Sequence, residues 1–217
     1  MDQMTENCRE VSIGSDPQLT ALLGVPQHSS GLIIFAHGSG SGRLSPRNNY
    51  VARRLREVGL ATLLLDLLSP GEERDRANVF DIPLLASRLA RATDWAESFP
   101  DTSGLRPAYF GASTGAGAAL RAAAGDRRIG AVVSRGGRPD LAGKQALSAV
   151  LAPTLLIVGS LDTPVIQLNS AAAAELTCAS EMAIVPGASH LFEEPGTLDR
   201  VVDLAADWFL THLGRQA

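Results

Sequence analysis

Cysteine, lysine and aromatic residues are all scarce in this chain of 217 residues. The two cysteines, Cys8 and Cys178, form no C-x-x-C pair, so we expect both to be reduced and incidental to the structure. Lys144 is the single lysine, and the net charge is −4 with no block of basic residues. Because phosphate binding depends on clustered lysine and arginine, we expect no nucleic acid partner.

The chain also lacks long apolar runs. None approaches the roughly 20 residues that a membrane-spanning helix needs, so we expect no membrane association. The segment Met1 to Glu10 is polar and acidic, without the basic and apolar regions of a secretory signal. A cytoplasmic location is the expectation that follows.

The chain does contain an alternation of apolar strands and amphipathic helices, within a length typical of one α/β domain spanning 1–217. Such alternation predicts a mostly parallel, doubly wound sheet with helices on both faces. A hairpin around Gly14 to Pro17 predicts an antiparallel edge at the N-terminus. The expected strands are 10–13, 19–23, 31–36, 60–65, 108–112, 130–134, 154–159 and 182–185, and the expected helices are 46–58, 82–99, 116–124 and 197–213.

A G-x-S-x-G pentapeptide, Gly111 to Gly115, lies between the expected strand at 108–112 and a helix of small residues. In a strand–turn–helix setting this motif presents its serine on a tight, strained turn at the edge of the sheet. The flanking glycines leave room for the neighbouring strand and helix. Ser113 is therefore the candidate nucleophile.

An acid and a histidine follow later strands. Asp162 comes just after the strand at 154–159, and His190 follows the strand at 182–185. A serine hydroxyl needs a base to take its proton, and the base needs an acid to orient it. We expect Ser113, His190 and Asp162 to meet in these roles at the carboxyl ends of parallel strands. Weaker candidates for base or acid are His28, His212, Asp66, Glu193 and Glu194.

A glycine-rich segment, His37 to Gly42, follows the buried strand at 31–36. We expect it to form an oxyanion loop, with the backbone N–H groups of Ser39 and Thr114 as the two donors. His37 is a candidate for substrate contact, although bracing the loop is the favoured role.

The same glycines also match the pattern of a dinucleotide-binding turn. The order of elements is the same: a strand, a G-x-G-x-G loop, a helix, and a second strand that ends in Asp66. The loop is long for a tight pyrophosphate turn. A nucleotide-binding oxidoreductase also leaves Ser113, Asp162 and His190 without a role, so this alternative is disfavoured.

Arg135 follows the expected strand at 130–134 and is the second candidate for substrate contact. A guanidinium at that place suits an anionic part of a substrate. The favoured alternative is an internal ion pair with Asp140 or with a group near Asp162.

The segments Phe35 to Gly40, Gly111 to Gly115, Gly159 to Asp162 and Gly187 to His190 resemble those of α/β-hydrolases in the compact dienelactone-hydrolase-like branch. The resemblance covers nearly the whole chain. It implies an α/β-hydrolase fold and a hydrolase of small esters that needs no metal or cofactor and is a monomer or homodimer. Dienelactone hydrolases proper carry a cysteine nucleophile, whereas Ser113 favours carboxylesterase chemistry. Some proteins with the same Ser-Arg-Gly-Gly-Arg-Pro-Asp segment are fused to phosphoribosyltransferase domains, and we expect none here.

We expect a serine carboxylesterase that cleaves small esters through an acyl-enzyme. The insertion at 69–81 is too short for a large cap domain, so we predict an open site and short acyl chains. Hydrolysis of lactones, including dienelactones, and of thioesters uses the same three groups and stays open. So does a binding protein that keeps the hydrolase fold with little turnover.

Overall fold

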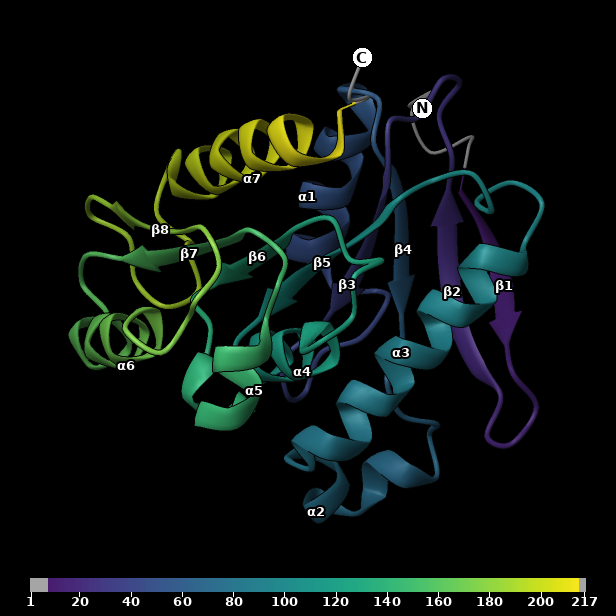
Figure 1. Ribbon diagram of the computed structural model, residues 1–217, viewed down its shortest axis with the longest axis horizontal. Helices are drawn as coiled ribbons and strands as arrows, with labels where there is room; N and C mark the ends of the chain where they lie inside the picture. The colour runs from purple at the N-terminus through teal and green to yellow at the C-terminus, as the bar shows by residue number, and fades with distance from the viewer. Residues whose placement is uncertain (1–7, 215–217) are drawn as a thin grey trace.

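A computed structural model describes residues 8–214, which form one eight-stranded sheet flanked by helices (Figure 1). Residues 1–7 of the polar N-terminal segment and residues 215–217 of the expected domain lie outside the described residues. The strand order is β1-β2-β4-β3-β5-β6-β7-β8. The strands are β1 (Cys8–Ile13), β2 (Leu19–Gly24), β3 (Leu32–Ala36), β4 (Ala61–Leu65), β5 (Pro107–Ala112), β6 (Val132–Arg135), β7 (Thr154–Gly159) and β8 (Ser180–Val185).

The helices alternate with the strands along the chain. They are α1 (Pro46–Glu57), α2 (Arg76–Val79), α3 (Ile82–Ser98), α4 (Thr114–Ala123), α5 (Lys144–Ala149), α6 (Thr163–Ala173) and α7 (Thr197–Leu213), with 3-10 turns at Glu72–Arg74 and Pro139–Ala142. The predicted α/β class is confirmed. Several boundaries differ from expectation by one or a few residues; near the site, α4 begins directly after Ser113 and β6 includes Arg135. The helices α2, α5 and α6 were not predicted.

Pairing is parallel throughout from β4 to β8, whereas β1 and β2 form an antiparallel edge. This arrangement confirms the mostly parallel sheet with its antiparallel N-terminal edge. β4 and β5 pair with opposite sides of β3, so the loops that leave β3 and β5 diverge. In open α/β sheets, ligands bind at the carboxyl ends of the strands where such a divergence occurs.

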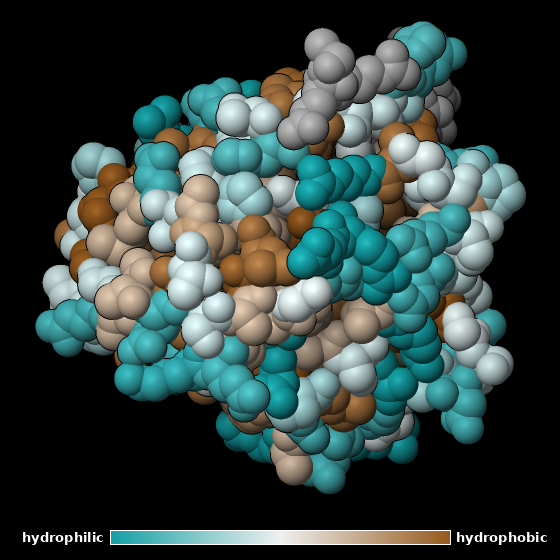
Figure 2. Space-filling view, viewed as in Figure 1, coloured by the Kyte–Doolittle hydropathy of each residue, from teal (hydrophilic) through white to brown (hydrophobic). Residues whose placement is uncertain are grey.

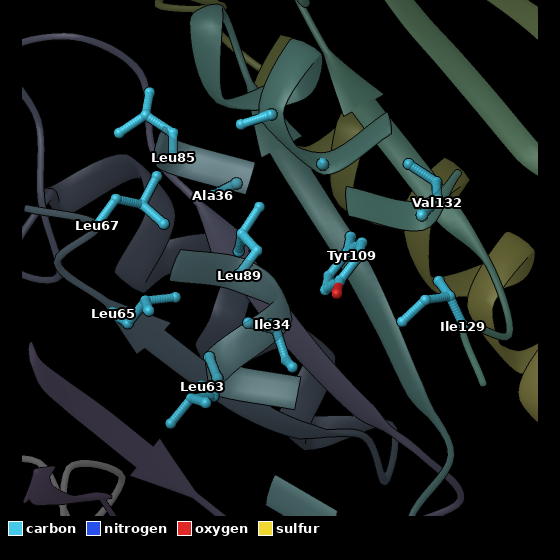
Figure 3. Close-up of a cluster of buried hydrophobic side chains, with 14 of the residues drawn as sticks. Ile34, Ala36, Leu63, Leu65, Leu67, Leu85, Leu89, Tyr109, Ile129 and Val132 are labelled. Atoms are coloured by element: carbon cyan, nitrogen blue, oxygen red, sulfur yellow. The ribbon is translucent and has the colours of Figure 1, made fainter. Parts of the chain in front are cut away.

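Two hydrophobic layers cover the sheet. One packs α1 and α7 against one face, and the other packs α3 and α4 against the opposite face. Figure 3 shows the second layer, where Leu89 of α3 lies near Ala36 and Ile34 of β3, and Leu85 lies near Leu67. Leu85 and Leu89 are four residues apart, which places them on the same face of the helix.

The start of α1 follows from its sequence. Ser45 accepts a hydrogen bond at its Oγ from the Asn48 N–H, at 3.4 Å, and Pro46 occupies the first turn. A serine cap satisfies one of the free amides at a helix start, and proline has no amide to satisfy there. These residues fix the direction in which the glycine-rich loop enters the helix.

The end of α7 lies at the amino ends of β3 and β6. A Cβ on Gly31, just before β3, would lie 2.7 Å from Leu213 Cδ1. A Cβ on Gly130, just before β6, would lie 2.3 Å from Leu213 Cδ2. Glycine at both positions therefore lets the last turn of α7 seat against the sheet.

The insertion at 69–81 forms α2 and a 3-10 turn, and residues 8–214 contain no large cap domain. Figure 2 shows hydrophilic residues over much of the right of the view and apolar patches toward the left. None of the helices among residues 8–214 combines the length and apolarity needed to cross a bilayer.

Candidate active site

The turn between β5 and α4 holds Ser113 in a strained conformation. Its φ is 50° and its ψ is −123°, which a residue with a side chain adopts only when its surroundings enforce it. A Cβ on Gly111 would lie 2.5 Å from Ala116 Cα, and one on Gly115 would lie 2.2 Å from Ala36 O. The two motif glycines thus allow the turn to press against α4 and the end of β3.

The structure brings Asp162 and His190 together. Asp162 follows β7 at the N-cap position of α6, yet its side chain does not cap that helix. Asp162 Oδ2 instead lies 2.6 Å from His190 Nδ1. An ionised carboxylate only accepts hydrogen bonds, so Nδ1 carries the proton and donates a hydrogen bond to Asp162 Oδ2. The imidazole is then oriented with Nε2 free to accept a proton.

The end of β6 connects the serine turn to the histidine. The Ser113 N–H donates to Arg135 O at 3.4 Å, and the Arg138 N–H donates to Ser113 O at 3.0 Å. A Cβ on Gly136 would lie 3.0 Å from His190 O. No hydrogen bond joins Ser113 Oγ to His190 within the described part of the chain, so that contact stays a prediction. Such bonds often form only in the substrate complex.

The two predicted oxyanion donors lie together. The Ser39 N–H donates to Thr114 Oγ1 at 3.1 Å. Gly38 is close to the nucleophile, since a Cβ there would lie 3.0 Å from Ser113 Cβ. The sequence pointed to the Thr114 amide and gave no sign that the Thr114 hydroxyl would engage Ser39.

A cavity of about 700 Å³ opens beside these residues. The glycine-rich loop and Thr114 form one wall, and the 69–81 insertion with its neighbours forms the other. Charged side chains stand among apolar ones in the lining, which includes Arg43, Arg47, Asp66, Glu73, Leu68 and Val79. The cavity adjoins the predicted oxyanion loop, whereas Ser113, Asp162 and His190 are not among its lining residues.

Known structures share this architecture. A crystal structure of dienelactone hydrolase from Anabaena variabilis superposes with a TM-score of 0.91 at 52% sequence identity, covering 95% of this chain and 99% of that one. The chain belongs to the α/β hydrolases, in their dienelactone-hydrolase-like branch. Est1E from Butyrivibrio proteoclasticus, at a TM-score of 0.80 and 16% identity over 95% of this chain and 99% of that one, shares the fold. No family model matches the chain.

Curated relatives of this α/β hydrolase are longer. Proteins from two strains of Mycobacterium tuberculosis, provisionally named phosphoribosyl transferases, are 58% identical over 206 residues. The match covers 94% of this chain and 46% of each relative, so the chain spans about half their length.

Asp66, the alternative candidate for the catalytic acid, binds the glycine-rich loop of the hydrolase through Arg43. Asp66 Oδ1 accepts from the Arg43 N–H at 2.6 Å, and Oδ2 pairs with the Arg43 guanidinium. A Cβ on Gly42 would lie 2.7 Å from Asp66 Oδ1. Asp66 therefore ties the loop to the end of β4.

His37 also braces the loop. Its Nε2 accepts from the Leu67 N–H at 3.1 Å, so Nδ1 carries the ring proton and donates to Gly38 O at 3.0 Å. The side chain is buried. With both nitrogens engaged by the backbone, the geometry supports the bracing role and leaves no ring nitrogen for substrate.

Arg135 has none of the ion pairs expected of it. Asp140 pairs with Arg138 instead, at 2.7 Å between Nη2 and Oδ2, because that arginine lies two residues away. The Arg135 side chain is only 8% exposed, and its Nη2 lies 3.4 Å from Asn48 Oδ1. Burial, aided by nearby Arg47, lowers the pKa of Arg135 to about 10. The structure thus holds a buried cation at the end of β6, next to Asn48 of α1, without a carboxylate partner among residues 8–214.

The remaining candidates lie elsewhere or serve other contacts. His212 packs edge-on against Trp208 within α7, and Glu193 pairs with Arg47. Glu194 accepts a hydrogen bond from the Ser189 N–H. Across residues 8–214, no group of three or more histidine, cysteine or acidic side chains is placed to hold a metal ion.

Proposed function

We propose that this hydrolase is a serine carboxylesterase acting on small esters with short acyl chains. The observation that carries the proposal is the 2.6 Å contact between Asp162 Oδ2 and His190 Nδ1. It lies at the edge of the sheet where the strained turn presents Ser113. An oriented histidine beside an elbow serine is the arrangement that acyl transfer requires.

In the proposed reaction, Ser113 Oγ attacks the ester carbonyl carbon while His190 Nε2 takes the hydroxyl proton. The Ser39 and Thr114 amides and the start of α4 stabilise the resulting oxyanion. The C–O bond to the alcohol then breaks, and His190 returns the proton to the leaving oxygen. Water, deprotonated by His190, attacks the acyl carbon, the bond from that carbon to Ser113 Oγ breaks, and His190 returns the proton to Oγ as the acid leaves.

The Ser39 amide is engaged by a neutral hydroxyl in the unliganded structure. Hydrogen bonds to a charged acceptor are roughly twice as strong as those between neutral groups. A developing oxyanion therefore competes well with Thr114 Oγ1 for the Ser39 proton, so the observed contact is compatible with Ser39 as a donor.

The short-acyl preference is supported by the cavity wall. A long alkyl chain needs continuous apolar surface, whereas this lining mixes apolar side chains such as Leu68, Val79 and Leu85 with the charged side chains of Arg43, Arg47 and Glu73. The open edge without a large cap also offers little apolar area to bury a long chain. Equal turnover of C4 and C12 esters would count against this part of the proposal.

The proposal is tested with a series of p-nitrophenyl esters from C2 to C12, assayed with wild type and Ser113→Ala side by side. We expect turnover of the short esters by wild type and none above background by the variant. Equal rates in both proteins would remove Ser113 from its role. No turnover by either, with esters, lactones and thioesters all present in the panel, would favour a binding protein.

A further inference from the structure

Thr114 contacts both the nucleophile turn and the glycine-rich loop, which carry Ser113 and Ser39 in the proposed reaction. It is the residue after Ser113 and the first residue of α4. Its side chain is 6% exposed, and its Oγ1 accepts the Ser39 N–H at 3.1 Å. A threonine hydroxyl has one proton to donate and two lone pairs. Ser39 uses a lone pair and leaves the proton available.

The proton of this hydroxyl has no acceptor among residues 8–214. Two other buried threonines differ, since Thr102 donates to Ala96 O at 2.7 Å and Thr154 donates to Ala152 O at 3.0 Å, whereas buried Thr62 also only accepts, from Arg56 Nη1 at 2.8 Å. Thr114, by contrast, lines the cavity of about 700 Å³ together with Ser39. A buried polar group that is left with an unused donor beside a cavity is well placed to serve a ligand there.

We propose that the Thr114 hydroxyl is a catalytic donor, giving its hydrogen bond to the oxyanion formed on the ester carbonyl. The inference rests on the proposed esterase function. Before substrate arrives, the Ser39 N–H bond holds Oγ1 beside the loop, and as the oxyanion forms the Ser39 N–H and the Thr114 O–H both donate to it. α4 and the serine turn hold the side chain in place before the substrate arrives. Hydrogen bonds fixed in advance toward developing charge are those that accelerate acyl transfer.

The first test compares Thr114→Val, which removes the hydroxyl and keeps the shape, with Thr114→Ser, which keeps it. We expect Thr114→Val to lower kcat on p-nitrophenyl acetate by about 100-fold or more, the usual loss for one oxyanion donor. KM should change little, because the charge develops only in the transition state. Thr114→Ser should stay within about tenfold of wild type, since its hydroxyl can make both contacts.

A second measurement separates donation from mere support of the loop. Ser113 Oγ adds to the carbonyl carbon of a trifluoromethyl ketone, its proton goes to His190 Nε2, and the C=O π electrons leave a negative oxygen where the ester oxyanion would be. A methyl ketone of the same shape binds without forming that charge. Donation by Thr114 predicts that Thr114→Val weakens the trifluoromethyl ketone alone, by a factor close to the loss in kcat. A displaced loop would weaken both ketones alike and would overturn the proposal.

Thr197→Val is the matched control, because Thr197 also begins a helix and is also 6% exposed. Its turnover should remain near that of wild type. An unchanged kcat in Thr114→Val would contradict the proposal. A higher kcat would also contradict it, because it would mean that the hydroxyl obstructs the oxyanion. An equal loss in Thr114→Ser would contradict it too. Ser113→Ala tests the esterase function independently, so failure of the proposed function can be told apart from failure of the proposed role of Thr114.

Discussion

The two halves of the candidate site are built differently. On the β7–β8 side, the reactive groups are side chains, and a single contact of 2.6 Å joins Asp162 to His190. The His190 side chain is 39% exposed. On the β3–β4 side, the group with a role in the proposed reaction is a backbone amide of the glycine-rich loop, which donates a hydrogen bond. Side chains of Asp66, His37 and Thr114 hold that loop at separate points.

This difference shows where each half gets its geometry. Asp162 and His190 lie in the loops that follow β7 and β8, and their direct contact orients the imidazole. A loop rich in glycine has little rigidity of its own, so its amides are fixed by neighbouring side chains, of which Asp66 and His37 have no part in the proposed reaction. Substitutions on the acid–base side should remove a chemical step, whereas those beside the loop should misplace a donor.

The largest effect is expected from Asp162→Asn. An amide at this position favours the wrong imidazole tautomer, because its NH₂ group donates to Nδ1. We expect kcat to fall by about 10⁴-fold, as in a serine protease with the same change, with KM little altered. Steady-state kinetics on a short ester measure this. Asp126→Asn serves as control, since Asp126 binds Arg128 away from the site. Near-normal turnover by Asp162→Asn would mean that a substitution on the acid–base side does not remove a chemical step, contrary to the difference drawn between the halves.

An intermediate effect is expected from Asp66→Ala. The change removes the acceptor for the Arg43 N–H and the partner of its guanidinium, so the loop loses its anchor to β4. A displacement of about 1 Å at a reacting group can cost on the order of 100-fold in rate, and we expect a loss of that size in kcat. Glu10→Gln is the matched control, because it removes the other partner of Arg43 and leaves the loop amide bound. Equal rates in both variants would show that the loop is rigid without Asp66.

Arg135 lies between the halves, and we expect Arg135→Met to stabilise the protein. Because burial lowers its pKa to about 10, the charged form costs folding free energy at every pH below 10. The cost fades as the pH rises from 10 toward the ordinary value of arginine. Methionine removes the charge while filling the space, which should raise the free energy of unfolding at pH 7 by about 1–3 kcal/mol. Urea denaturation measures this, with Arg138→Met as control. A loss of stability in Arg135→Met would mean that Asn48 compensates the charge fully.

The smallest effect is expected from Glu193→Gln. Glu193 pairs with Arg47 at 2.7 Å and so joins the loop after His190 to the start of α1. Both side chains are well exposed, at 61% and 38%, and exposed pairs contribute little. We expect kcat to stay within about twofold of wild type and the melting temperature to be nearly unchanged. A large loss in kcat would reveal mechanical coupling between the halves.

The sequence was informative wherever a local pattern determines local structure. A G-x-S-x-G motif between a strand and a helix predicted the turn that holds Ser113. The ends of later strands predicted the pair of Asp162 and His190, because parallel strands deliver their carboxyl ends to one edge. The Ser45 cap likewise predicted where α1 begins.

Contacts between distant segments could not be predicted in the same way. Asp66 was visible as an acid at a strand end, but its partner Arg43 depends on how the loop folds back. Arg135 was expected to pair with Asp140 or with a group near Asp162, but Asp140 pairs with Arg138, which is nearer in the sequence. The Thr114 hydroxyl depends on one side-chain rotamer, which no spacing encodes. The α6 helix could have been found, since Thr163 and Pro164 are typical of a helix start.

The seating of Leu213 against Gly31 and Gly130 has a practical consequence. Those glycines mark the amino ends of their strands, and Ser113 lies at the carboxyl end of β5 between them. The strands separate these edges by roughly 15–20 Å. A fluorophore or solid support attached near residue 214 would therefore face away from entering substrate. Immobilised enzyme coupled there should keep the turnover it has in free solution.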